Sequence, residues 1–440
     1  MASQSRQPNR QVTASPNAWR ERTHAWARFG GLWRHSNFRR LWAGQTVSQL
    51  GSTITREALP YTAILALGAS PLQMGLLGAA GAAPLLLLGL FAGVWVDRMP
   101  RRPLMIAADV GRALLLLSIP LAYLLGALRI EQLYLIAALT GILTVFFNVA
   151  YHALLPALVE RDQLVEANSK LSISESLAEI AGPPLGGALV QMISGPITLL
   201  LDALSFVASA LSLLRMRVAE PPATPPAEQP HILRDLTTGL QAIWNSPLLR
   251  AFAGSAIIRN FFGWFFGAIY GLYAIRVLGL GTATLGLVVA CGGIGGFLGA
   301  ALVGPLTRRW GIGPIIVGAL LIDAAASGLT WLAGGLLPLA VPLLIASQLI
   351  GDGAMIVALI AERSLRQAIT PDRQLGRVNA SMNVLSEGIG TLGLLAGGVL
   401  AEAIGLRPTA GVAVLGIMAS ALVALLSPLR RQRALPDSEE

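Results

Sequence analysis

The residues of this sequence that could do chemistry are a few ionisable side chains inside long apolar runs. Arg56 and Glu57 lie in one such run, and Glu175 and Glu179 lie in another. If these runs cross a bilayer, a charge near the centre is unfavourable by at least about 2.5–3.5 kcal/mol, which makes each charge a functional candidate. A carboxyl group in a partly dry cavity can bind and release protons near neutral pH. We therefore take Glu57 first, and then Glu179 and Glu175, as candidate proton carriers.

The same acids have a competing interpretation as structural charges. Neighbouring helical residues point about 100° apart, so Arg56 and Glu57 need not pair with each other, and each could pair with another helix. Glu175 and Glu179 are four positions apart and share one helical face, where two carboxylates repel each other and could share a proton. Glu175 could instead lie at the membrane surface and be hydrated. The sequence leaves these alternatives open.

Other charges in the apolar runs are candidate partners for these acids. Asp109 and Arg112 are three positions apart, so they can pair within one helix, and we expect this pair to be structural. Asp202 lies near the end of its run, where we expect it at the membrane interface.

A second set of charges has no obvious local partner. Arg259 and Asp352 are in this set, and with Asp323 and Glu387 they could complete a charge network across a cavity. Which face of each helix looks inward is not fixed by the sequence.

Seven aromatic residues fall within the thirteen positions FFGWFFGAIYGLY, residues 261–273. Such a cluster could form an adaptable apolar wall for an amphipathic molecule, with Trp264, Phe265 and Tyr270 as candidate contacts. The alternative is contact with lipid, or an interfacial belt, because rings at these positions encircle a helix.

The elements that would position these residues are membrane-spanning helices. Hydrophobic residues make up 54% of the 440 positions and charged residues only 12%, about half of the ~25% typical of soluble domains. Twelve apolar runs are long enough to cross a hydrocarbon core of about 30 Å. They are 39–67, 72–96, 104–126, 131–156, 170–193, 197–214, 248–277, 283–306, 313–335, 338–361, 379–404 and 409–428. We predict an all-α polytopic membrane protein with 12 transmembrane helices.

The chain divides into two halves joined by the proline-rich PPATPPAEQP. We expect a disordered cytoplasmic tail (1–36), a six-helix bundle (37–215), a cytoplasmic linker (216–246), a second six-helix bundle (247–428) and a cytoplasmic tail (429–440). An internal repeat supports this division. At an offset of 211, Gly182, Gly186 and Gly187 match Gly393, Gly397 and Gly398.

The positive charge sets the orientation. If the first residues are cytoplasmic, 26 of the 32 Lys and Arg residues fall in cytoplasmic segments and three in outer loops and span ends. The positive-inside rule then places both termini in the cytoplasm. The net charge of +9 therefore reflects topology in the cytoplasmic (inner) membrane, and we expect no nucleic-acid partner.

Two motifs stand out. A glycine followed by an acid and several basic residues closes the second run, as Gly93, Asp97, Arg98, Arg101 and Arg102 of GVWVDRMPRR. The acid could accept from a helix N-terminus or from an arginine across the bundle interface, which would give this motif a gating role, while the arginines face the anionic leaflet. The matching segment of the second half, GPLTRRWG, keeps the arginines and lacks the acid. A solvated turn would explain the arginines equally well.

The second motif is GPPLGG, with Gly182, Pro183, Pro184, Gly186 and Gly187. Its glycines allow close helix contact and its prolines bend the helix; simple tight packing is the alternative.

These motifs resemble the loop signature and the exporter-associated GPxxGG signature of the major facilitator superfamily. NFRRLWAGQTVSQLGSTITREALP, FFNVAYHALLPALV and QLVEANS resemble its enterobactin-exporter-like and macrolide-efflux-like branch, over about 36–428. The resemblance implies the fold of this superfamily, with parallel repeats around a central cavity. It also implies proton-driven export of a small amphipathic molecule such as a drug, macrolide or siderophore. Proton-coupled uptake and a non-transporting membrane sensor are the alternatives.

Several classes of activity are disfavoured. The sequence has no GxxxxGK[ST] string and one lysine, Lys170, so we expect no ATP chemistry. Cys291 is the only cysteine, and no His, Asp and Glu cluster shows metal-ligand or triad spacing. We expect no cofactor, no metal and no enzyme activity, and we expect a monomer in the lipid bilayer whose partners are protons and a small substrate.

Overall fold

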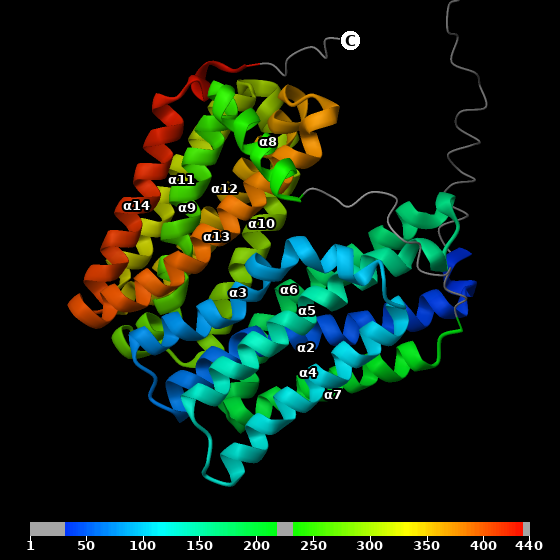
Figure 1. The fold of residues 1–440 in the computed structure, drawn as a ribbon. Helices are drawn as coiled ribbons and strands as arrows, with labels where there is room; N and C mark the ends of the chain where they lie inside the picture. Colours follow the sequence, from blue (N-terminus) through cyan, green and yellow to red (C-terminus); the bar gives the residue numbers. More distant parts are fainter. Residues whose placement is uncertain (1–30, 218–231, 434–440) are drawn as a thin grey trace, which may run out of the picture.

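The computed structural model describes residues 31–217 and 232–433. The first half holds six long helices (Figure 1). They are α2 (Ser36–Ala66), α3 (Pro71–Val96), α4 (Arg101–Leu124), α5 (Ile130–Leu158), α6 (Leu164–Ile193) and α7 (Gly195–Leu214). Short helices η1 (Gly31–Arg34) and η2 (Arg161–Gln163) lie before α2 and α6.

The second half repeats this arrangement. Its long helices are α9 (Pro247–Leu272), α10 (Thr282–Trp310), α11 (Ile312–Ala333), α12 (Ala340–Ile369), α13 (Asp372–Ile404) and α14 (Leu406–Leu426). The shorter ones are α8 (Ile232–Asn245), η3 (Tyr273–Val277, a π-helix), η4 (Leu337–Leu339) and η5 (Pro428–Arg431). The described residues contain no strand, which confirms the all-α class.

Local sequence explains several helix ends. α3 begins with Pro71 at its first position, and the Ser70 hydroxyl accepts from the backbone N–H of Gln73, whose side chain accepts from the Ser70 N–H. Gly311 and Gly405, with φ of 87° and 89°, separate successive helices in the left-handed region that glycine adopts readily.

Ten helices of the described chain are long and apolar enough to cross a membrane. α2 and α6 are not among these ten, although both are as long; α6 carries Glu166, Lys170, Glu175 and Glu179. The structure is thus that of a multi-pass membrane protein, and the count of twelve spans stays a prediction.

Three predicted segment boundaries need correction. Residues 31–34 of the expected tail form η1, in which Leu32 is fully buried. Within the expected linker, α8 is an amphipathic helix that packs on α13, where Arg377 pairs with Asp235 at 2.7 Å and Ser381 donates to the Leu236 carbonyl. Residues 1–30 and the PPATPPAEQP segment lie outside the described residues. The predicted C-terminal tail, 429–440, also begins with ordered chain, because Leu429 of η5 is buried and Gln432 accepts from the Gly313 N–H.

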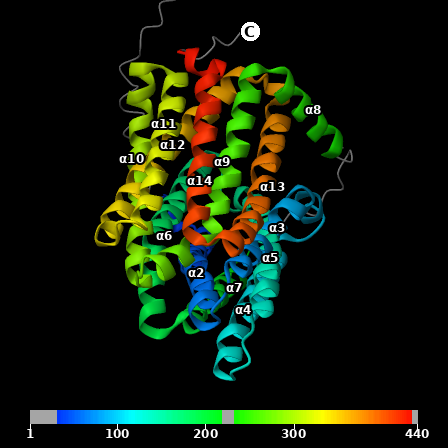
Figure 2. The same ribbon diagram turned by 90° about the vertical axis from the view of Figure 1, so that its left-hand side faces the viewer.

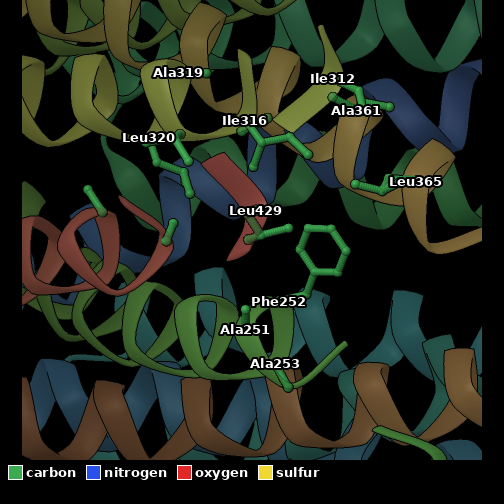
Figure 3. Packing of buried hydrophobic residues seen from close by; sticks show 14 of the residues in the cluster. Ala251, Phe252, Ala253, Ile312, Ile316, Ala319, Leu320, Ala361, Leu365 and Leu429 are labelled. Carbon is green, nitrogen blue, oxygen red and sulfur yellow. The ribbon is translucent and has the colours of Figure 1, made fainter. Parts of the chain in front are cut away.

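Helices α2–α7 and α9–α14 form two bundles, each with its own apolar core. In the second bundle Phe252, Ile316, Leu365 and Leu429 pack together although they are far apart in sequence (Figure 3). The bundles touch through α3 with α13 and α6 with α10. They diverge toward the ends that carry Ser36, Leu214 and α8 (Figures 1 and 2). A space between the bundles is therefore closed at one end and wide at the other.

Candidate functional site

A cavity of about 730 Å³ lies between the two bundles. The first half contributes Arg56, Glu57, Pro60 and Tyr61, all from α2, and every other lining residue belongs to the second half. Eight of the sequence-derived candidates are thus brought to one space: Arg56, Glu57, Arg259, Trp264, Tyr270, Asp323, Asp352 and Glu387.

Glu57 lies in this cavity beside tyrosines. The Tyr61 hydroxyl donates to Glu57 Oε2 at 2.9 Å. Tyr270, across the cavity on α9, is within electrostatic reach of both Glu57 and Asp352. The Tyr270 hydroxyl is buried and makes no hydrogen bond within the described chain. Glu57 therefore has a polar, cavity-facing setting in which a proton or a substrate group can reach it.

Arg56 links α2 to α6. Its guanidinium donates to both carboxylate oxygens of Glu179 at 2.8 Å. Glu179 is not among the cavity-lining residues, and neither is Glu175, which is exposed near His152. Glu179 thus pairs with Arg56, and proton sharing between Glu175 and Glu179 stays a prediction.

The second half supplies most of the charge in the cavity. Asp323 and Asp352 line it from α11 and α12, and Arg259 of α9 lies within electrostatic reach of Asp323 and Glu362. Arg259 makes no ion pair within 4 Å in the described chain; its Nη1 contacts the Met355 sulfur at 2.9 Å. The charged residues of the expected network therefore line the cavity, but they do not form ion pairs with one another.

Glu362, Arg363 and Arg366 also line the cavity and were missed by the sequence analysis, which assigned them to a loop. α12 runs through them to Ile369, and Glu362 pairs with Arg366 at 3.8 Å. Opposite charges four apart are a helical signal that could have found them.

The aromatic cluster divides into two faces. Trp264 and Tyr270 line the cavity, whereas Phe265 is 3% exposed and absent from the lining, because α9 turns it toward α13. There Gly397 and Gly393 approach the α9 backbone at Phe265 and Phe261. Phe265 is thus corrected from a wall candidate to a packing residue.

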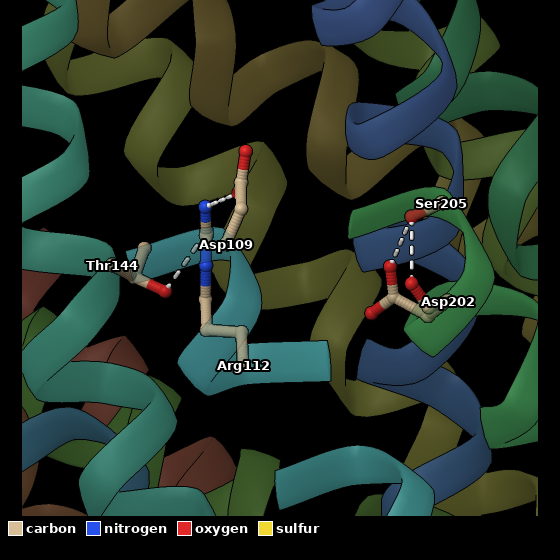
Figure 4. Close-up of polar contacts among 5 residues, drawn as sticks. All are labelled: Asp109, Arg112, Thr144, Asp202 and Ser205. Atoms are coloured by element: carbon tan, nitrogen blue, oxygen red, sulfur yellow. Dashed lines mark hydrogen bonds and ion pairs between the residues drawn. The ribbon is translucent and has the colours of Figure 1, made fainter. Parts of the chain in front are cut away.

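Asp109 and Arg112 form the predicted pair within α4, away from the cavity. Asp109 is fully buried and accepts from Arg112 Nη2 (Figure 4). The Arg112 guanidinium also lies over the rings of Phe147 and Phe206, at 4.4 and 4.1 Å from their centroids. Both charges are therefore neutralised and packed between helices.

Asp202 is a correction to the expected interfacial position. It is 1% exposed on α7, where the Ser205 hydroxyl donates to its carboxylate at 2.7 Å (Figure 4). Gly51 of α2 leaves the space that Asp202 and Ser205 fill. Asp202 also interacts electrostatically with Arg112, so it extends the buried charge cluster of the first bundle.

We expect Asp109→Asn to lower the melting temperature of the protein purified in detergent. Removing one partner of a buried ion pair costs about 3–5 kcal/mol, since the other charge stays buried without full compensation. The control is Asp235→Asn, which breaks an exposed pair worth at most about 1 kcal/mol. Equal melting temperatures for the two variants would show that the buried pair does not stabilise the fold.

The narrow end of the space is closed by two repeat-related contacts. Gly187 of α6 lies against the Thr282 carbonyl of α10, and the Thr282 hydroxyl donates to the Gly187 carbonyl at 2.8 Å. Gly398 of α13 lies against Pro71 and Gly75 of α3. At each of these positions an added Cβ would press on backbone atoms.

Two side chains reinforce these contacts by capping helices of the other half. Gln191 accepts from the Ala283 N–H at the start of α10, and Glu402 accepts from the Leu72 N–H at the start of α3, at 3.0 and 3.1 Å. Gln191 and Glu402 are 211 positions apart, as are Leu72 and Ala283. Residues at matching positions of the sequence repeat therefore make equivalent contacts with the other half.

The remaining residues of GPPLGG pack within the same region. Gly182 lies against Thr53, Gly186 lies against Ile54 and Glu57, and the Pro183 carbonyl lies against Gly286 of α10. Pro184 is next to Pro183 inside α6. The motif thus joins α2, α6 and α10 close to the candidate proton carrier.

The residues of GVWVDRMPRR lie at the end of α3 and the start of α4. Arg101 donates to the Ala153 carbonyl, and Arg102 donates to the Leu213 and Leu214 carbonyls at the end of α7. Both arginines thus bind backbone carbonyls of α5 and α7, and their orientation toward the anionic leaflet stays a prediction. Asp97 is exposed and makes no hydrogen bond or ion pair with another described side chain; Gly93 and Arg98 are near it at the end of α3.

The sequence profile of the Major Facilitator Superfamily matches residues 41–390. The chain belongs to this superfamily. The family expected from the motifs is confirmed. The multidrug efflux pump Tap of Mycolicibacterium fortuitum is 28% identical over 392 residues, covering 87% of this chain and 93% of Tap. The enterobactin exporter EntS of Citrobacter koseri is 28% identical over 361 residues, covering 78% and 81% of the two chains.

Solved structures share the superfamily fold. A bacterial homologue of the iron transporter ferroportin in its inward-facing state has a TM-score of 0.70 at 18% identity, with 88% of this chain and 98% of that chain covered. The outward-facing state of such a homologue has a TM-score of 0.54 at 17% identity, with the same coverage. Within the described residues, no group of three His, Cys, Asp or Glu is arranged to hold a metal ion.

Proposed function

We propose that this superfamily member exports a small amphipathic molecule in exchange for protons, by alternating access. In this proposal twelve helices, α2–α7 and α9–α14, cross the cytoplasmic (inner) membrane with both termini in the cytoplasm. One observation carries it: a cavity lined by carboxylates lies between two repeats that touch at one end only.

The conformation corresponds to the state open to the cytoplasm. The wide end of the space lies toward the helix ends that carry most of the Lys and Arg residues, which the positive-inside rule assigns to the cytoplasm. The higher similarity to the inward-facing ferroportin homologue supports the same assignment. The closed end, at Gly187 and Gly398, is then the outer gate.

The cavity has the chemistry of a site for an amphipathic molecule. Trp264, Phe266 and Tyr270 supply ring surface, and Glu57, Asp323 and Asp352 supply negative charge. Apolar walls with a few polar groups are typical of small-molecule sites. The names of Tap and EntS support export of a drug or siderophore.

Proton-coupled export is tested in everted vesicles energised with an inwardly acidic proton gradient. A macrolide, ethidium and a catecholate siderophore are supplied in turn, and we expect at least one to accumulate and to be released by a protonophore. Vesicles that contain an unrelated membrane protein are the control. Accumulation only in right-side-out vesicles would identify uptake symport, and no flux of any compound under either gradient would favour a sensor; both results contradict the proposal.

A further inference from the structure

An apolar groove of about 380 Å³ lies on the side of the second bundle, away from the central cavity. It is formed by α10, α11 and α12, and its walls include Leu298, Leu302, Trp310, Ile322 and Ile350, all of them at least 47% exposed. Gly318 forms part of its floor, with no atom of a neighbouring residue within 4 Å of the position a Cβ would take. Since α10–α12 are among the apolar spanning helices, this groove faces lipid.

One end of the groove is strongly basic. Arg308 and Arg309 precede Trp310 at the end of α10, and neither makes a hydrogen bond or ion pair with a described residue. The Arg309 guanidinium lies over the Trp310 ring, 5.1 Å from its centroid. No Asp or Glu occurs between residues 303 and 322. The guanidinium groups therefore have free donors beside an apolar channel.

η5 adds further basic residues to the same end. Gln432 accepts from the Gly313 N–H at 2.8 Å, which holds the chain after η5 across the turn between α10 and α11. Arg430, Arg431 and Arg433 are exposed beside this contact. Five arginines thus lie at this end of the groove. The chain between residues 303 and 322 contains no acidic residue that could neutralise them.

The first half does not have this arrangement, although its segment is repeat-related. There Arg101 and Arg102 donate to carbonyl groups of Ala153, Leu213 and Leu214. At the 211-residue offset, the counterparts of Arg308 and Arg309 are Asp97 and Arg98, and those of Arg101 and Arg102 are Ile312 and Gly313. The second copy therefore carries an arginine, Arg308, at the position of the acid Asp97.

We propose that this groove binds an anionic phospholipid of the cytoplasmic leaflet. One acyl chain lies along Leu298, Leu302 and Gly318, and the phosphate accepts from Arg308 and Arg309. The α10 segment from Gly295 to Trp310 lines the groove and is about 22 Å long at 1.5 Å per residue. That length suits an acyl chain with its headgroup, because half of the hydrocarbon core is about 15 Å thick. This site requires only that α10–α12 cross a bilayer, so it stands independently of substrate and coupling.

The test is a lipid titration of the full-length protein in detergent, followed by native mass spectrometry. Phosphatidylglycerol and phosphatidylcholine with the same acyl chains are compared. We expect the wild-type protein to prefer phosphatidylglycerol, and Arg308→Gln with Arg309→Gln to reduce its affinity about thirtyfold, because each basic residue near an anionic surface contributes about fivefold. Arg234→Gln with Arg373→Gln removes the same charge from exposed cytoplasmic-end positions on α8 and α13 and should leave the preference unchanged.

A second variant separates the groove from its charges. Gly318→Phe has room for its Cβ and adds a ring in the lining of the groove, so we expect it to weaken binding of both lipids while Arg308 and Arg309 stay in place. Equal phosphatidylglycerol binding by the wild type and the double arginine variant would overturn the proposal, as would full binding by Gly318→Phe. Competition by millimolar inorganic phosphate that displaces the lipid completely would show a free-anion site and would overturn it too.

Discussion

Gly187→Ala combined with Gly398→Ala is expected to hold the outer ends of the two bundles apart. Each new methyl group would press on backbone atoms of the other half, at Thr282 and at Pro71. Overpacking of this kind costs about 1–3 kcal/mol. Since about 1.4 kcal/mol changes an equilibrium constant tenfold, the population closed at the outer gate should fall roughly fivefold to a hundredfold. Export should fall with it, because a protein that cannot close outside cannot return to the cytoplasm-open state.

The expected loss of export is not what helix propensity predicts, so the experiment distinguishes steric contact from propensity. Ala is favoured over Gly in a helix by about 0.8–1 kcal/mol, so propensity alone predicts no loss of function. Distances between spin labels at Ala127 and Leu336, exposed in outer loops of the two halves, report opening in a Cys291→Ser background. Gly376→Ala is the matched control, because no neighbouring atom lies within 4 Å of its new Cβ. Wild-type distances and export in the double variant would show that these glycines do not form the gate.

The sequence predicted the close helix contacts at the repeated glycines better than it predicted the residues that line the cavity. The 211-residue repeat was visible as matched glycines, and the structure turns it into matched contacts, with Gln191 and Glu402 in equivalent roles. Small residues at matching positions of two repeats mainly allow neighbouring helices to pack closely. The glycine pattern in the sequence therefore agrees with the helix contacts in the structure. Most span ends were likewise located within a few residues, but α12 extends eight residues beyond the predicted end at 361, and α13 begins seven residues before the predicted start at 379.

The sequence could not predict which side chains of a spanning helix face the cavity and which are packed against other helices. Spanning helices such as α9 are apolar on nearly all sides, so no polar face distinguishes cavity from packing. Trp264 and Phe265 are adjacent in sequence, yet one lines the cavity and the other is buried against α13. Asp202 was misplaced because its burial depends on Gly51 and Ser205, which come from two different helices.

Arg56, Glu57 and Glu179 show what the structure adds to the mechanism. From sequence, Glu57 was the first candidate proton carrier and Glu179 the second. In the structure Glu179 accepts two hydrogen bonds from Arg56, whereas Glu57 accepts one from a neutral tyrosine and lines the cavity. A carboxyl group beside a neutral donor in a partly dry space can bind and release a proton. The geometry therefore supports Glu57 as the proton carrier.

Glu57→Gln is accordingly expected to reduce gradient-driven export to the background level of vesicles without the protein. Gln keeps the size and the hydrogen-bond acceptor for Tyr61 but has no proton to exchange, so substrate binding measured in detergent should persist and should lose its pH dependence. Tyr61→Phe is the control. It removes the hydrogen bond between Tyr61 and Glu57, leaves the carboxylate in place, and should retain export. Because Glu57 also lies against Gly186 in the motif that packs on α10, a proton on Glu57 could be sensed directly at the outer gate. Full export by Glu57→Gln would exclude this carboxylate from the coupling step and transfer the role to Asp323 or Asp352 in the second half.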